Sequence, residues 1–262
     1  MKSLAVVTGI ALLAWALAIQ KQGERTLVSQ GAYSMVGNDA NGARKVSKLD
    51  EWRMYADKDG SYSVDIEAAA QSPMMEEHYV LTTDLKPKSF SLIVSSKNSN
   101  ASGESVTISC DFDSEKITCH TVGGGVTASP TLVQKIPYVF MPTAEAPSLD
   151  LPWFFQTIAS QAGRSIGQKS AIPLVAIEDG DTADSATLKI QEVEQVEYLG
   201  REKIEVAGRT VLSHKFRISI PQSATPEDLW LSDSGLLLQL SQQGNPSLAL
   251  TSYEGPPLIN EH

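Results

Sequence analysis

The fold is decided by residues 203–220, which read KIEVAGRTVLSHKFRISI. Ala207-Gly208 in this stretch has the form of a two-residue turn between antiparallel strands. After the turn, hydrophobic and polar side chains alternate with a period of two, which predicts a strand with one buried face. The side chains expected on that face are Leu212, His214, Phe216, Ile218 and Ile220.

The residues that follow continue the same pattern. Asp228-Leu-Trp-Leu leads into a turn over 232–235, a strand over 236–241, a turn at Gln-Gly-Asn-Pro and a strand over 247–253. Gly, Asn, Pro and Ser in these turns favour tight chain reversal. The sequence therefore predicts a three-stranded antiparallel meander at the carboxyl end.

Alternation also runs through the first two thirds of the chain. A hairpin is expected over 50–68, with its turn at Lys58-Asp59-Gly60. A long strand over 188–198 carries a bulge, because Val193 falls out of phase before Val196 and Tyr198 restore it. Further strands are expected over 78–84, 89–96, 104–112, 116–122 and, from a weaker pattern, 132–140.

The two cysteines lie in one predicted hairpin. If Ser114-Glu115 form its turn, Cys110 falls directly opposite Cys119 in a non-hydrogen-bonded pair, whose short Cα separation suits a cross-strand disulfide. Such a bond would contribute about 2.5 to 3 kcal/mol of stability. A redox pair is the alternative, but the cysteines lack the C-x-x-C setting that lowers a thiol pKa.

One segment departs from the strand pattern. Prolines punctuate a crossover over about 130–150, and Asp150, Pro152 and Gly163 then delimit a predicted helix over 151–162. The expected fold is mainly β, with a single curved antiparallel sheet, half-barrel-like, wrapping this one α-helix. Residues 19–262 would form one β-rich domain.

The first residues have the pattern of a signal peptide. Lys2 precedes an apolar stretch over 4–18, and cleavage is expected after Ala18, with a site after Ala16 as the alternative. The stretch is short for a membrane span, although an uncleaved anchor stays open. No cysteine is present for lipidation. We expect an exported protein, periplasmic or extracellular, that is not a lipoprotein and has no membrane span once residues 1–18 are removed.

Composition narrows the function classes. The chain has 262 residues, of which 42% are hydrophobic and 20% charged, enough to bury an ordinary core and too apolar for a disordered tail. Its formal net charge of −10, without a run of Lys or Arg, argues against a nucleic-acid partner.

Catalytic and metal motifs are weak. Gly163-Arg-Ser165-Ile-Gly167 matches the G-x-S-x-G string of serine hydrolases, but a helix is expected before Ser165 and strands after it, whereas a nucleophile elbow needs the reverse. His214 lies on an apolar face, where a hydrogen-bonded core histidine is commoner than a catalytic one. The other histidines lack zinc-site spacing. We expect no catalytic residue, metal or cofactor.

The last third resembles a family of exported bacterial proteins. The resemblance is to envelope proteins of unknown function that are similar in fold to the periplasmic lipoprotein carriers LolA and LolB. It is carried by a strand ending at Gly200, residues 203–210, an alternating strand over 212–220, and Asp228-Leu-Trp-Leu-Ser-Asp-Ser-Gly-Leu-Leu-Leu-Gln-Leu240. The resemblance implies a curled antiparallel sheet around an apolar cavity. It supplies no catalytic residues, because the carriers are not enzymes.

We therefore expect a non-catalytic envelope protein that binds a lipid or other apolar ligand between sheet and helix. An interaction module for another envelope protein is the alternative, and a serine hydrolase acting through Ser165 is a second one. The residues expected to line the ligand cavity are Trp153, Phe154, Phe155, Ile158, Phe216, Ile218 and Trp230.

Overall fold

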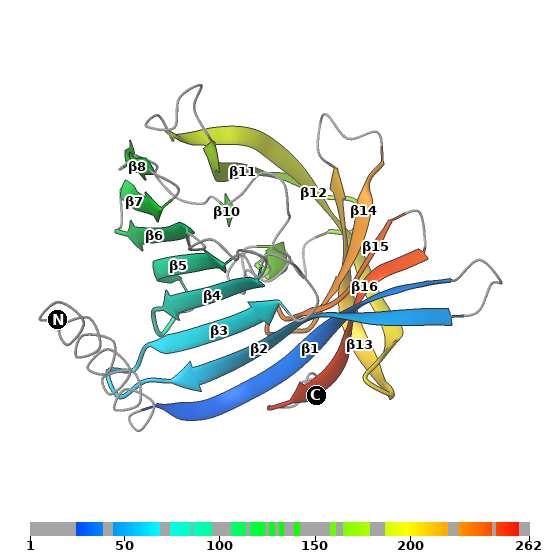
Figure 1. The fold of residues 1–262 in the computed structure, drawn as a ribbon. Helices are drawn as coiled ribbons and strands as arrows, with labels where there is room; N and C mark the ends of the chain where they lie inside the picture. Colours follow the sequence, from blue (N-terminus) through cyan, green and yellow to red (C-terminus); the bar gives the residue numbers. More distant parts are fainter. Residues whose placement is uncertain are drawn as a thin grey trace, which may run out of the picture.

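The computed structural model shows a single sheet that curls around its own inner face (Figure 1). It describes residues 25–38, 44–68, 74–84, 86–95, 106–113, 116–123, 126–128, 131–133, 139–141, 158–160, 165–178, 187–219, 225–242 and 245–256. Within these residues, sixteen strands belong to the sheet.

The first half of the sheet consists of hairpins, each strand pairing antiparallel with the next. Its strands are β1 (Thr26–Asn38), β2 (Arg44–Ala56), β3 (Tyr62–Ala68), β4 (Met74–Leu81), β5 (Pro87–Ser95), β6 (Val106–Phe112), β7 (Lys116–Gly123) and β8 (Val126–Ala128). The short strand β9 (Thr131–Val133) also pairs with β7.

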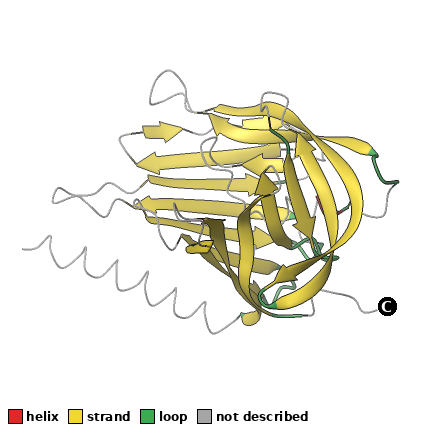
Figure 2. Ribbon diagram, turned by 90° about the vertical axis from the view of Figure 1, so that its right-hand side faces the viewer, coloured by secondary structure: helices red, strands yellow, loops and turns green. Residues whose placement is uncertain are grey.

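The second half runs steeply inclined to the first, as Figure 2 shows. Its strands are β10 (Val139–Met141), β11 (Lys169–Glu178), β12 (Thr187–Val206), β13 (Arg209–Ser219), β14 (Glu227–Leu231), β15 (Leu237–Gln242) and β16 (Asn245–Glu254). The pairing between β10 and β11 is parallel, and the other described pairings are antiparallel.

Strand β1 joins the two halves, because it pairs with β2 on one side and with β16 on the other. The order of the sheet is β10-β11-β12-β13-β14-β15-β16-β1-β2-β3-β4-β5-β6-β7-β8. In the described residues this path is open, with β10 and β8 at its ends. The sheet is therefore curled but not closed into a barrel.

The local hairpin predictions are confirmed. Val206 pairs with Arg209 around the predicted turn, where Ala207 and Gly208 both have positive φ, 48° and 75°. The bulge predicted near Val193 is present as a register shift, in which Leu174 pairs with Glu192 but the next residue pairs with Ile190. The meander predicted over 228–253 corresponds to β14, β15 and β16.

The disulfide is confirmed as well. Cys110 pairs with Cys119, and their Cα atoms are 4.0 Å apart across a bond between the sulfur atoms. Asp113 and Lys116 close the hairpin, since the amide of Asp113 donates to the carbonyl of Lys116 at 2.9 Å. The turn residues 114 and 115 lie outside the described residues.

Two predictions about the middle of the chain have other outcomes. The single strand expected over 132–140 is wrong, because β9 pairs with β7 whereas β10 pairs with β11 in the other half. Of the predicted helix over 151–162, Ile158 and Ala159 are helical, Ser160 is a turn, and the rest lies outside the described residues. No helix in the described part of the chain has the length and hydropathy of a membrane span.

Candidate functional site: the inner face of the sheet

The inner face carries several of the residues predicted to line a cavity. Phe216 and Ile218 of β13 lie two residues apart on this face and are almost fully buried. Across the strand pairs, Phe216 is opposite Leu229 of β14, and Ile218 is opposite Val196 of β12. The register thus builds a continuous apolar surface over β12–β14.

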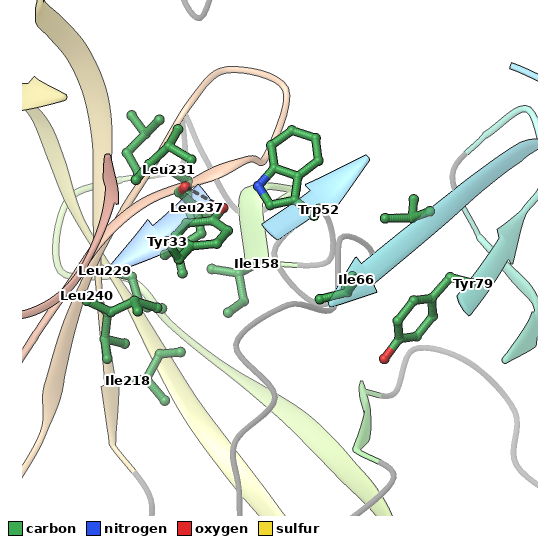
Figure 3. Packing of buried hydrophobic residues seen from close by; sticks show 14 of the residues in the cluster. Tyr33, Trp52, Ile66, Tyr79, Ile158, Ile218, Leu229, Leu231, Leu237 and Leu240 are labelled. Atoms are coloured by element: carbon green, nitrogen blue, oxygen red, sulfur yellow. Dashed lines mark hydrogen bonds between the residues drawn. The ribbon is translucent and has the colours of Figure 1, made fainter. Parts of the chain in front are cut away.

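Ile158 lies at the centre of the hydrophobic core, with 0% of its surface exposed. Figure 3 shows it between side chains from the two halves of the sheet. On one side are Ile218, Leu229 and Leu240, and on the other are Ile66 and Tyr79. The predicted residues Trp153, Phe154 and Phe155 lie outside the described residues.

Trp230 does not share this face, which corrects the predicted lining. Residues opposite each other in an antiparallel pair lie on the same face, and Trp230 is opposite Lys215, one residue away from Phe216. On the outer face, the Lys215 ammonium lies 4.5 Å from the centre of the indole ring, and Trp230 Nε1 donates to Glu202 Oε2 at 3.1 Å. Trp230 is therefore covered by the charged side chains of Lys215 and Glu202 on the outer face of the sheet.

Ser165 lies in a turn that leads directly into β11. Its carbonyl accepts a hydrogen bond from the Gln168 amide at 3.0 Å, and Gly167 has a φ of 82°. A nucleophile elbow places a helix after its serine, and this serine is followed by a strand. The geometry around Ser165 lacks this feature of a hydrolase.

His214 is hydrogen-bonded on both ring nitrogens at one end of the inner face. Nδ1 lies 3.1 Å from the hydroxyl of Tyr198, and Nε2 lies 2.8 Å from Oδ1 of Asp233. Arg201 binds the same carboxylate oxygen at 3.1 Å. This network satisfies the buried imidazole, so it serves the packing of β12, β13 and the β14–β15 turn.

A polar group on β2 and β4 was not predicted from the sequence. Asp50 and Trp52 are buried, 7% and 8% exposed, and both belong to the inner face of β2. Glu77 of β4 pairs with Ile66 of β3, which in turn pairs with Trp52. The sequence signal for Glu77 is its alternation with Tyr79 across His78. The strand was expected to begin at residue 78, so Glu77 was left outside it.

The pKa of Glu77 is raised from 4.5 to about 7. Burial is the main cause, because it penalises the charged carboxylate. The hydroxyl of Tyr79 donates to Glu77 Oε2 at 2.7 Å and opposes the rise, while the negative charge of Asp50 adds to it. Glu77 as a whole residue is half-buried.

On the outer face, in contrast to Glu77 on the inner face, carboxylates are paired with cationic side chains. Asp65 contacts Arg25 at 2.8 Å and His78 at 2.6 Å. Burial acts against ionisation there, but hydrogen bonds from His78 and Arg25 hold the pKa of Asp65 below its ordinary value. Arg217 and Asp228 form a similar pair at 2.8 Å.

Comparisons with known proteins bear on the fold. No protein-family model matches the chain, and no curated protein does. Among solved structures, the chain is similar to a beta-barrel-like protein of a domain of unknown function, DUF1849, from Brucella abortus. The two are 9% identical, with a TM-score of 0.50 over 89% of this chain and 100% of that one. The likeness shows a beta-barrel-like fold and nothing about function.

Proposed function

We propose that the chain is a non-catalytic, exported envelope protein that binds a lipid or other apolar ligand on the inner face of its sheet. One observation carries the proposal. The inner face is largely apolar from β13 round to β7, with Ile158 at its centre. A curved sheet with such a face is suited to enclosing an apolar molecule.

Export is supported by the disulfide and the first residues. Disulfides persist in oxidising compartments, and the Cys110–Cys119 bond is buried within the core. The signal-like residues 1–18 agree with this location. The resemblance to LolA and LolB in the last third supports a ligand-binding role of the same general kind.

The test is native mass spectrometry with organic extraction on protein purified from its own envelope without detergent. A stoichiometric apolar molecule is the expected result. Ile218→Trp would place a larger side chain on the inner face and lower the fraction of protein that carries the apolar molecule. Ser219→Trp changes the next residue, on the outer face, and would leave that fraction unchanged. Circular dichroism and a thiol count confirm that both variants fold.

An empty protein that also fails to bind an added apolar dye would contradict the proposal. That result would favour the alternative function, an interaction module for another envelope protein. A pull-down from the envelope would then be the next experiment.

A further inference from the structure

Three polar side chains share one part of the inner face. Asp50 and Trp52 are two residues apart on β2 and therefore point to the same side of the sheet. Trp52 is opposite Ile66 on β3, and Ile66 is opposite Glu77 on β4. We call Asp50, Trp52 and Glu77 the β2–β4 patch.

The indole nitrogen of Trp52 has no hydrogen-bond partner, although the residue is only 8% exposed. The ring lies across β1, so that a Cβ at Gly31 would be 2.8 Å from Cζ2. Figure 3 shows the nitrogen on the edge of the ring that faces Tyr33, the residue opposite Asp50. A buried N–H without a partner costs about 1 to 3 kcal/mol, which an oxygen of a ligand would recover.

The surroundings of Glu77 favour a cation. Its two cross-strand neighbours, Ile66 and Leu92, are apolar, and Tyr79 next to it supplies only a hydroxyl. Asp50 adds a second carboxylate near enough to raise the pKa of Glu77. An ammonium group would form charge-assisted hydrogen bonds with the two carboxylates, and the rings of Trp52 and Tyr79 would add cation–π attraction.

We propose that the β2–β4 patch binds the head of an amphipathic ligand that carries an ammonium group and a neighbouring oxygen. Asp50 and Glu77 accept hydrogen bonds from the ammonium, and Trp52 Nε1 donates to the oxygen. The hydrocarbon chain lies along the apolar surface over β12–β14. This inference rests on the proposed function and adds the chemical class of the ligand, an amine-headed lipid.

The experiment compares two lipids that differ in the ammonium group. Lauroyl lysophosphatidylethanolamine and lauroyl lysophosphatidylglycerol share chain and phosphate, and the affinity of each is measured by its displacement of a neutral apolar dye, N-phenyl-1-naphthylamine, from the protein. At neutral pH the ethanolamine lipid is expected to bind about tenfold more tightly, as charge-assisted hydrogen bonds imply. Glycerophosphoethanolamine, which has the head without the chain, should displace no dye at the same concentrations.

Variants separate the three groups of the patch. Asp50→Asn and Glu77→Gln should each abolish most of the preference for the ethanolamine lipid over the glycerol lipid. Trp52→Phe keeps an aromatic ring, although a smaller one, and removes the N–H, so it should weaken the binding of both lipids by a similar factor. Glu76→Gln is the matched control, because Glu76 precedes Glu77 but is exposed on the outer face. Circular dichroism and a thiol count check the fold of each variant.

Each outcome has a distinct meaning. Equal affinity of the wild type for the two lipids, or a preference that survives Glu77→Gln, overturns the β2–β4 patch as an ammonium site while leaving apolar-ligand binding intact. Displacement by glycerophosphoethanolamine overturns the assignment to a lipid. Failure of the dye and both lipids to bind contradicts the proposed function itself.

Discussion

Replacing Glu77 by Gln should make the protein more stable in neutral and alkaline solution but not in acid. Burial raises the pKa of Glu77 in the folded state from 4.5 to about 7, so the folded state holds a proton that the unfolded state has released between these values. Stability therefore falls as the pH rises through this window and is constant below 4.5 and above about 7. The Gln variant lacks this contribution of residue 77 to the fall.

The size of the effect follows from the pKa values. A difference of one in pKa between folded and unfolded states corresponds to about 1.4 kcal/mol. The rise from 4.5 to about 7 then sets a ceiling of about 3 kcal/mol on the gain above neutral pH. Because the residue is half-buried and water screens part of its charge, we expect about 1 to 3 kcal/mol.

The assay is urea unfolding of the wild type, Glu77→Gln and Glu76→Gln across the pH window, with tryptophan fluorescence as the probe. The difference between wild type and Glu77→Gln should grow with pH, whereas Glu76→Gln should follow the wild type. Burial also raises the pKa of Glu227, but this contributes the same slope to all three proteins. Parallel curves for the wild type and Glu77→Gln would refute the argument.

Three further changes test the fold. Replacing both Cys110 and Cys119 by Ala should cost about 2 to 3 kcal/mol in urea unfolding, and an unchanged midpoint would show that the disulfide adds nothing. Gly31→Ala would place a Cβ 2.8 Å from a carbonyl oxygen of β16, so it should cost about 1 to 3 kcal/mol, whereas Gly37→Ala, with open space around it, should be nearly neutral. Ala207→Asn should stabilise by about 0.5 to 1 kcal/mol, because Asn tolerates the left-handed φ of 48° better than Ala, and a lower melting temperature would contradict this.

Hairpins were predictable because their signals act over a few residues. The register that places Cys110 opposite Cys119 follows from the position of one turn, and the structure has that register. The Ala207-Gly208 turn sets the pairing of β12 with β13 in the same way. The mainly antiparallel β class followed from a chain of such local units.

Faces were harder to predict where a strand is apolar on both sides. Leu229, Trp230 and Leu231 are all buried, so alternation does not indicate which of them points inward. The answer depends on how β14 is offset against β13, where Phe216 is opposite Leu229. That offset is set after a connection of several residues, and this is why Trp230 was assigned to the wrong face.

Strand β1 was not predicted, because its signals are broken and its partner is remote. Its register shifts between Ala32 and Tyr33 against β16, and between Tyr33 and Ser34 against β2, which disturbs the period of two. Strand β16 lies at the far end of the sequence, so nothing local indicates the pairing. The β2–β4 patch was missed for a similar reason, since Asp50 and Glu77 meet only through β3.

Strand β1 also explains how the proposed head and chain sites belong to one binding face. Gly31 allows the Trp52 ring to lie across the strand, and two residues later the hydroxyl of Tyr33 donates to the Leu237 carbonyl of β15 at 2.8 Å. This buried hydrogen bond fixes the position of β1 against the second half of the sheet. A ligand that contacts both the β2–β4 patch and the apolar surface over β12–β14 would therefore bind to two halves of the sheet that are already fixed relative to each other. Its binding would cost less conformational entropy than binding that first had to bring the two halves together.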